Sequence, residues 1–140
     1  MLLTGQPGIS KSTLLRNFIK NYRGDKLGFV TNEIKIDDER TGFEVETSDG
    51  RFIQIASIIQ QEDCIGKVGK YYVGSYEFGL LIAKLLYEDT DNKLLYIDEI
   101  GPIQLMFPLF EDLVNKFLAT SNTFVGTVKQ LNVTSVYRTS

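Results

Sequence analysis

A glycine-containing loop near the N-terminus constrains the fold of this chain more than any other segment. It reads Gly5, Gln6, Pro7, Gly8, Ile9, Ser10, Lys11, Ser12 and Thr13. The mostly apolar residues 2–4 predict a short strand before it, and a helical pattern follows it as far as Gly24. The apolar residues of that helix share one face: Leu14, Leu15, Phe18, Ile19 and Tyr22. A strand, a tight loop and a helix in direct succession are typical of α/β domains.

The loop resembles a cradle for phosphate groups. The pattern for such loops is G-x-x-x-x-G-K-[ST], and Gly5, Lys11 and Ser12 fall at the required spacing. Backbone N–H groups of the loop can converge on an anion at the positive N-terminus of the helix. Lys11 would pair with the β- and γ-phosphate oxygens, and Ser12 would ligate Mg²⁺. The competing interpretation is a plain turn followed by a helix that begins Lys-Ser-Thr.

Ser10 stands where the pattern has its last glycine. If the backbone there needs a positive φ or a very close phosphate, the Cβ of Ser10 costs affinity, on the order of 1 kcal/mol. Alternatively, the small serine hydroxyl adds a contact to a phosphate oxygen. The sequence leaves both interpretations open.

The rest of the chain alternates between strand and helix patterns. The predicted elements are a strand at 27–34, a hairpin over 43–55 that turns at 48–50, a loop with one short strand at 60–74, a helix that is capped by Ser75 and runs to 86, a strand at 94–97, a helix at 109–118 and a strand at 123–128. We therefore expect one domain over residues 1–140, with a three-layer α/β fold and a mostly parallel sheet that carries an inserted β-hairpin.

Two acidic residues, Asp98 and Glu99, directly follow the apolar run 94–97. Such a run is typical of a strand buried on both faces of a parallel sheet. In enzymes with a phosphate-binding loop, an Asp at the carboxyl end of a strand holds Mg²⁺. Glu99 would point to the other side of the strand, where it could polarise an attacking water as a general base. Taken alone, the same pattern also fits a solvated strand end.

Missing residue types exclude several chemistries. The chain has 140 residues, no His and one Cys, Cys64. Ser-His-Asp catalysis, His-ligated metals, an internal disulfide and a thiolate zinc site are therefore excluded. A net charge of −3 argues against a broad nucleic-acid or anionic-membrane surface, although it is compatible with a local basic pocket. Because the sequence shows neither a membrane-spanning run nor a signal peptide, we expect a cytoplasmic protein.

Together these motifs resemble the small P-loop nucleoside-triphosphatases, a family that includes a thermophile NTPase and the cancer-related nucleoside-triphosphatase of animals. The resemblance runs in order over nearly the whole chain. The matching blocks are 28–35, 41–43, 66–73, 97–106 and 126–129. Ser10 departs from the family pattern, as do Gln104, where the family usually has an acid, and Lys129, where it often has His.

The resemblance implies a RecA-like P-loop fold and Mg²⁺-dependent hydrolysis of ATP, GTP and other nucleoside triphosphates to the diphosphate and phosphate. It implies that loop 5–12 holds the phosphates, that Lys11 and Glu99 are catalytic, and that Ser12 and Asp98 ligate the metal. Nucleotide contacts would also come from Thr13, Asp98 and Glu99. The resemblance further leads us to expect a final C-terminal strand that residues 1–140 would lack.

Several other side chains have two interpretations each. Thr13 could contact the α-phosphate or only support the first helical turn, and Thr127 could sense the γ-phosphate or satisfy backbone groups. Glu33 could position water or a ribose, or be a surface carboxylate. Tyr71 and Tyr72 could stack on a base or pack in the core. Positive charge for the γ-phosphate could come from Lys129 or Arg138 of this chain. An arginine of another subunit could also supply it.

Two other functions fit the same motifs. A nucleotide-kinase-like phosphotransferase would pass the γ-phosphoryl group to a small acceptor. A nucleotide-binding module would have weakened turnover because of Ser10. Nucleotide kinases usually carry a lid with several arginines, whereas the arginines of this chain are dispersed: Arg16, Arg23, Arg40, Arg51 and Arg138.

Overall fold

The computed structural model describes residues 2–3, 9–120 and 122–129, with residues 2–3 and 9–12 described by their backbone alone. The helices are α1 (Ile9–Asn21), α2 (Tyr76–Tyr87), α3 (Pro102–Leu105) and α4 (Phe110–Ala119). The strands are β1 (Leu2–Leu3), β2 (Asp25–Ile36), β3 (Glu39–Thr47), β4 (Phe52–Ser57), β5 (Gly66–Val68), β6 (Tyr71–Val73), β7 (Lys93–Ile100) and β8 (Phe124–Val128).

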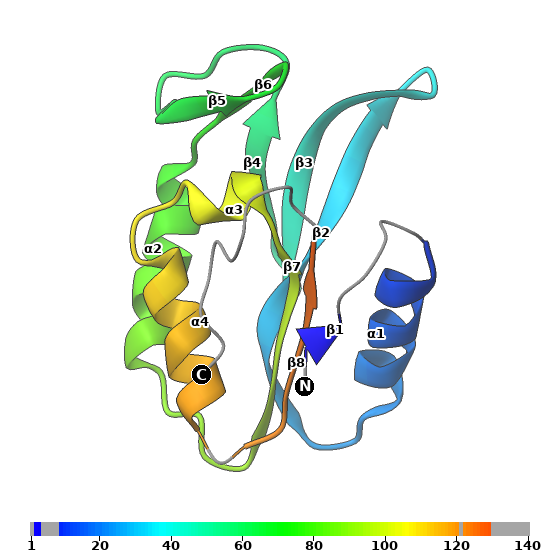
Figure 1. Cartoon of the computed structure of the whole chain (residues 1–140), viewed down its shortest axis with the longest axis vertical. Helices are drawn as coiled ribbons and strands as arrows, with labels where there is room; N and C mark the ends of the chain where they lie inside the picture. The colour runs from blue at the N-terminus through cyan, green and yellow to red at the C-terminus, as the bar shows by residue number, and fades with distance from the viewer. Residues whose placement is uncertain (1, 4–8, 121, 130–140) are drawn as a thin grey trace.

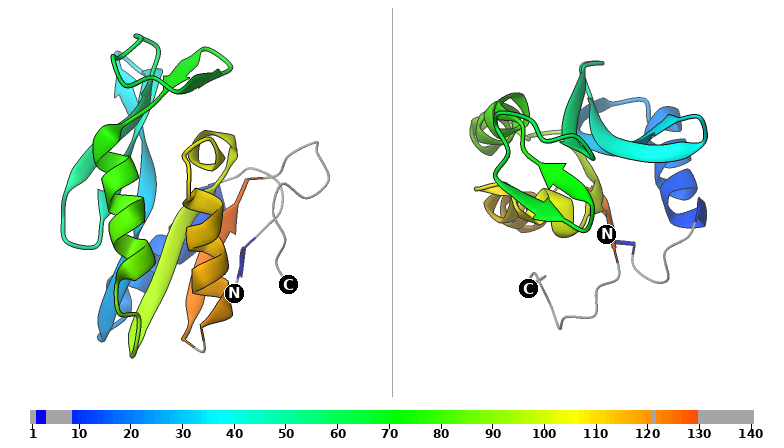
Figure 2. Two further views of the ribbon diagram at one scale, coloured as in Figure 1. Left: turned by 90° about the vertical axis from the view of Figure 1, so that its left-hand side faces the viewer. Right: turned by 90° about the horizontal axis from the view of Figure 1, so that it is seen from above.

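The elements form three layers. A sheet runs through the middle of the molecule, α1 covers one face, and α2 and α4 cover the other (Figures 1 and 2). This arrangement confirms the expected three-layer α/β fold. Among the described residues, none of the helices has the length and hydropathy that a membrane span requires.

The described strands form one mixed sheet in the order β1-β8-β7-β2-β3-β4-β6-β5. The part from β1 to β2 is parallel, and the part from β2 to β5 is antiparallel. The expected hairpin is present as β3 and β4. The antiparallel part extends beyond it, because residues 60–74 contribute two short strands, β5 and β6, where the sequence predicts one.

Strand β2 belongs to both parts of the sheet. Its first half pairs in parallel with β7, from Asp25 beside Lys93 to Val30 beside Asp98. Its second half continues past the end of that pairing and is antiparallel to β3. The carboxyl ends of the parallel strands therefore lie next to the antiparallel extension, and residues just after Val30 reach the same edge as Asp98.

The main apolar core lies between the sheet and the layer of α2 and α4. Its centre is a chain of aromatic rings in which Phe78 packs edge-on against Phe29, at 5.2 Å between centroids, and against Phe107, at 4.7 Å. On the opposite face, α1 is attached through a smaller cluster of buried side chains: Leu15, Leu94 and Val125. Ile19 and Tyr22 pack against this cluster, which among the described side chains is smaller than the core under α2 and α4.

Candidate functional site

Asp98 and Thr127 lie together at the carboxyl ends of two neighbouring parallel strands. Asp98 ends the apolar run of β7, and Thr127 lies near the end of β8. Both residues are buried, with 2% and 3% of their surface exposed. The Thr127 hydroxyl donates a hydrogen bond to Oδ1 of Asp98. Thr127 therefore supports the carboxylate directly, which is a contact that the sequence did not indicate.

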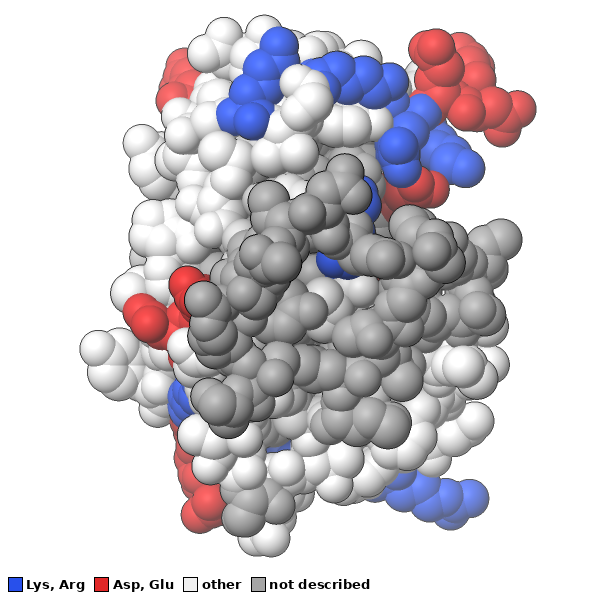
Figure 3. Space-filling view, viewed as in Figure 1, with Lys and Arg blue, Asp and Glu red and all other residues white. Residues whose placement is uncertain are grey.

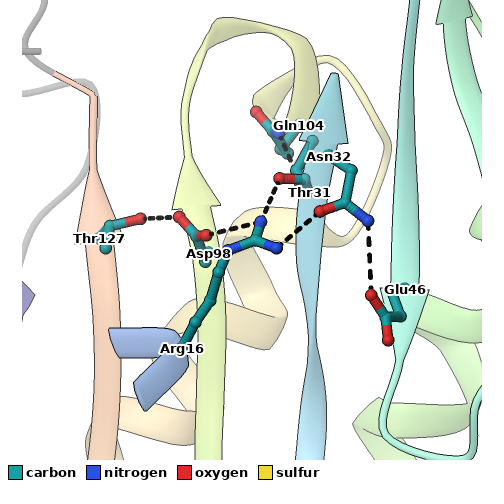
Figure 4. Close-up of polar contacts among 7 residues, drawn as sticks. All are labelled: Arg16, Thr31, Asn32, Glu46, Asp98, Gln104 and Thr127. Carbon is teal, nitrogen blue, oxygen red and sulfur yellow. Dashed lines mark hydrogen bonds and ion pairs between the residues drawn. The ribbon is translucent and has the colours of Figure 1, made fainter. Parts of the chain in front are cut away.

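Arg16 brings a positive charge from α1 to the same carboxylate. Its Nη2 lies 3.4 Å from Oδ2 of Asp98 and donates to the carbonyl oxygen of Thr31 at 2.8 Å. Its Nη1 donates to Oδ1 of Asn32 at 2.7 Å, and Nδ2 of Asn32 donates to Glu46 at 3.4 Å. One guanidinium group thus joins α1, the end of β7 and the middle of β2 (Figure 4).

Arg16 lies outside the two motifs that predict this site. A signal was present, because Arg16 follows Ser12 by four residues and positions i and i+4 share a helix face. The contacts with Thr31 and Asn32 had no comparable signal, because they depend on how far β2 continues past β7.

Glu99 faces a different environment from Asp98. It is half-buried and lines a cavity on the side of the β5–β6 hairpin and α3, whereas Asp98 contacts α1 and β8. The predicted divergence of the two carboxylates is therefore present in the fold. Lys129 lines the same cavity as Glu99, and its backbone N–H donates to the carbonyl oxygen of Ile100 at 3.0 Å.

Gln104 links α3 to β2 behind this cavity. It is 3% exposed, and its Nε2 donates to the hydroxyl of Thr31 at 3.2 Å. Because the backbone carbonyl of Thr31 accepts from Arg16, the same residue contacts both α1 and α3 (Figure 4). Gln104 therefore fixes the short helix that follows the two carboxylates.

The first half of the predicted phosphate loop 5–12 lies outside the described residues: Gly5, Gln6, Pro7 and Gly8. The backbone of Ile9, Ser10, Lys11 and Ser12 forms the start of α1, while their side chains also lie outside the description. Thr13 is exposed on α1, and Arg138 is outside the described ranges. The N-terminal end of α1 points toward the same end of the molecule as the carboxyl ends of β7 and β8 (Figure 1).

The other sequence candidates have contacts of their own. Glu33 is exposed and pairs with Arg40 at 2.7 Å and with Lys35 at 3.8 Å, which supports the surface interpretation. Tyr71 is buried and packs against Phe43 at 5.0 Å between ring centroids, which supports core packing. Tyr72 is half-buried, with Nζ of Lys67 4.8 Å from its ring.

The donor set at the end of β7 suits a hard divalent cation that shares its ligands with phosphate. Asp98 supplies a carboxylate, to which the Thr127 hydroxyl donates a hydrogen bond. Within residues 2–3, 9–120 and 122–129, no group of three or more His, Cys, Asp or Glu side chains could enclose a metal. Mg²⁺ in nucleotide sites is held by one or two carboxylates, substrate phosphates and water rather than by a cage of protein groups. The residues present therefore fit Mg²⁺ bound together with a nucleotide.

Comparisons with known proteins identify the family. Nucleoside-triphosphatase THEP1 of Thermotoga sp. (strain RQ2) is 32% identical over 135 residues, which cover 93% of this chain and 74% of that protein. The crystal structure of THEP1 from the hyperthermophile Aquifex aeolicus matches with a TM-score of 0.78 and 28% identity, over 96% of this chain and 78% of that one.

The solution structure of a human cancer-related nucleoside triphosphatase matches with a TM-score of 0.73 and 28% identity, over 97% of this chain and 78% of that one. The model of the family described as NTPase matches residues 1–139. With the family model and these relatives in agreement over nearly its whole length, this chain belongs to the NTPase family of hydrolases.

Proposed function

We propose that this protein is a Mg²⁺-dependent nucleoside-triphosphate phosphohydrolase, which converts ATP, GTP and other nucleoside triphosphates to the diphosphate and phosphate. The observation that carries the proposal is the divergence of two adjacent carboxylates at the end of β7. Asp98 contacts Arg16 of α1, and Glu99 lines a cavity on the other side. Two carboxylates in different environments can serve two roles, one on the metal and one on water.

The binding roles follow from charge and position. Loop 5–12 would hold the phosphates through backbone N–H groups, and Lys11 would neutralise oxygens of the β- and γ-phosphates. Ser12 and Asp98 would hold Mg²⁺, with Thr127 keeping the Asp98 carboxylate oriented. When bound, Mg²⁺ would supply positive charge that stabilises the phosphates in the transition state.

The chemical step would use Glu99. A water oxygen attacks the γ-phosphorus, the bond between that phosphorus and the β,γ-bridging oxygen breaks, and the nucleoside diphosphate leaves. The proton of the attacking water passes to the carboxylate of Glu99. Lys129, which lines the same cavity as Glu99, would add positive charge beside the transferring group.

Glu99→Gln tests this assignment. The amide keeps the shape of the side chain but cannot accept the proton, so hydrolysis of γ-labelled ATP should fall about 100-fold or more while nucleotide binding persists. Glu111→Gln, at an exposed position of α4, is the matched control and should keep the parental rate. Hydrolysis by Glu99→Gln at the parental rate would place water activation on another residue.

Analysis of the labelled products separates hydrolysis from the two other functions. Release of inorganic phosphate without an acceptor is the expected result. Label that moves only to an added small acceptor would instead indicate a phosphotransferase. Nucleotide binding without any turnover would indicate a binding module.

A further inference from the structure

A cavity of about 160 Å³ adjoins Glu99 at the carboxyl edge of the parallel strands. It lies among the β2–β3 hairpin, the β5–β6 hairpin and α3. Its lining combines apolar or aromatic residues with a few charged and polar ones: Arg40, Phe43, Val68, Gly69, Tyr71, Glu99, Pro102, Ile103, Gln104 and Lys129. This combination is typical of a pocket for a small molecule.

The volume inside the cavity accommodates about one ring. A protein cavity of about 150 Å³ binds benzene, whereas pockets for drug-sized ligands measure about 300–1,000 Å³. A complete nucleoside triphosphate therefore exceeds this cavity, whose volume is about 160 Å³. The space suits a separate molecule of the size of a substituted ring.

The wall of the cavity offers surfaces against which a flat group can pack. Phe43 and Tyr71 meet edge to face, with an interplanar angle of 68°. Val68 and Ile103 add aliphatic surface. A planar or apolar body fits such a wall better than an extended polar chain does.

Arg40 is already held in place for an anion. Its Nη1 donates to Glu33 at 2.7 Å and its Nε donates to Tyr71 Oη at 2.9 Å. Its guanidinium carbon lies 5.5 Å from the Phe43 ring centroid and 5.9 Å from that of Tyr71. Its Nη2 donates to none of the described residues, so a fixed donor is available to a ligand.

Further cations lie around the same end of the molecule. Nζ of Lys70 is 5.5 Å from the Tyr71 ring, and Lys129 lines the cavity without an ion pair to any residue in the described part of the chain. Lys and Arg side chains gather at the end of the molecule that carries β5 and β6 (Figure 3). Acidic side chains lie at this end as well, so an anionic ligand is favoured by two groups at the cavity itself, Nη2 of Arg40 and the side chain of Lys129.

We propose that this cavity is a binding site for a second small molecule, separate from the nucleotide, that combines a single flat ring with an anionic group such as a carboxylate or a phosphate monoester. The ring packs against Phe43 and Tyr71, and the anionic group pairs with Arg40 and Lys129. Because Glu99 lines the same cavity, the bound molecule lies beside the carboxylate that we assign to water activation. Binding itself does not depend on that assignment, whereas an effect on hydrolysis does.

Phenyl phosphate is the probe, and its binding to the full chain is measured without nucleotide, by calorimetry and by saturation transfer to the ring protons. Two matched probes each lack one part: phenol lacks the anionic group, and inorganic phosphate lacks the ring. Each should bind at least tenfold more weakly than phenyl phosphate. Arg40→Met should weaken phenyl phosphate at least tenfold. Arg23→Met, which removes an exposed arginine elsewhere, should leave its affinity unchanged.

Lys11→Ala separates this site from the phosphate loop, and it should bind phenyl phosphate as the parent does. The proposal is overturned if phenyl phosphate does not bind, if phenol binds equally well, if Arg40→Met has no effect, or if Lys11→Ala abolishes binding.

In a second experiment, phenyl phosphate should slow ATP hydrolysis by the parent but not by Arg40→Met. Binding without this inhibition would leave the site standing and contradict the role of Glu99.

Discussion

Asp98 carries its carboxylate at a position that solvent hardly reaches. A buried carboxylate without partners is costly, and removing one partner of a buried pair can cost about 3–5 kcal/mol. Here the partners are the Thr127 hydroxyl and the Arg16 guanidinium, whose side chain is 38% exposed. Solvent screening around Arg16 reduces its share of that energy. The Thr127 hydroxyl and the Arg16 guanidinium therefore hold the carboxylate in place at the end of the apolar run of β7.

Arg16→Met should lower the free energy of unfolding by about 1–2 kcal/mol, because Asp98 loses the guanidinium of Arg16 while the Thr127 hydroxyl remains. Mg²⁺ without nucleotide should recover part of this loss in Arg16→Met and have a smaller effect on the parent. The reason is that Mg²⁺ can replace the positive charge that Arg16 places beside the carboxylate. Thermal melts with and without Mg²⁺ measure both effects, and Arg23→Met is the control. Equal responses of Arg16→Met and the parent to Mg²⁺ would contradict this account.

Ser10→Gly addresses the departure in the loop pattern. Ser10 lies within α1, where glycine costs up to about 1 kcal/mol of helix stability. Without the Cβ, the backbone can approach a phosphate more closely. We expect Ser10→Gly to hydrolyse ATP faster and, without nucleotide, to melt at the same temperature or slightly lower. Slower hydrolysis by this variant would show that the serine hydroxyl serves the phosphates.

At the scale of elements, β2 depends on a close approach of two strands. Gly28 has φ +154°, and a Cβ there would lie 1.9 Å from the carbonyl oxygen of Tyr96 in β7. Neither the conformation nor the contact allows a side chain without movement of the backbone. A Cβ at Gly79 in α2 would meet no atom within 4 Å, so Gly79 provides a matched comparison.

Gly28→Ala should therefore lower the free energy of unfolding by at least about 2–3 kcal/mol, since it strains the pairing of β2 with β7. Gly79→Ala should raise it by about 0.5–1 kcal/mol, because alanine is the better helix former. Denaturant unfolding of the two variants and the parent gives the comparison. If the two variants had similar free energies of unfolding, the close approach of β2 and β7 at Gly28 would not be needed for stability.

The elements with a clear periodic pattern of apolar residues could be predicted from the sequence. The helix of residues 76–87 with its cap at Ser75 is confirmed, with Ser75 Oγ accepting from the Phe78 N–H at 3.0 Å. The apolar strand before the two acids is confirmed as β7, which includes both acids and continues to Ile100. Helix α3 and one of the strands β5 and β6 were not predicted, because three or four residues are too few to show a period.

The candidate site was predictable only in part for a related physical reason. Asp98 and Glu99 follow a buried strand, which is a local signal. The network of Arg16, Thr31 and Asn32 joins residues that are 15 to 16 positions apart, and its formation depends on strand pairing and helix placement. The pattern of a single segment contains no information on such contacts. The roles of Lys11, Ser12 and the loop before them remain predictions.

At the scale of the whole molecule, nucleotide binding should stabilise the fold. A ligand that binds only the native state adds about 2.7 kcal/mol at one hundred times its dissociation constant. Mg·ATP or Mg·GTP should therefore raise the melting temperature, and EDTA should reduce the shift. No shift with any of the four common nucleoside triphosphates would contradict the proposed nucleotide site.

The modest anchorage of α1 has a consequence for local opening of the native protein. Because α1 rests on the small cluster of Leu15, Leu94 and Val125, its detachment exposes less apolar surface than detachment of α2 or α4. The amides of α1 should then exchange with solvent deuterium through a partial opening that leaves β7 protected. The layer that would present its N-terminus to the phosphates is thus the layer with the smaller apolar cluster among the described side chains. A bound nucleotide would tighten this layer first, and protection of α1 would report on occupancy before the rest of the fold responds.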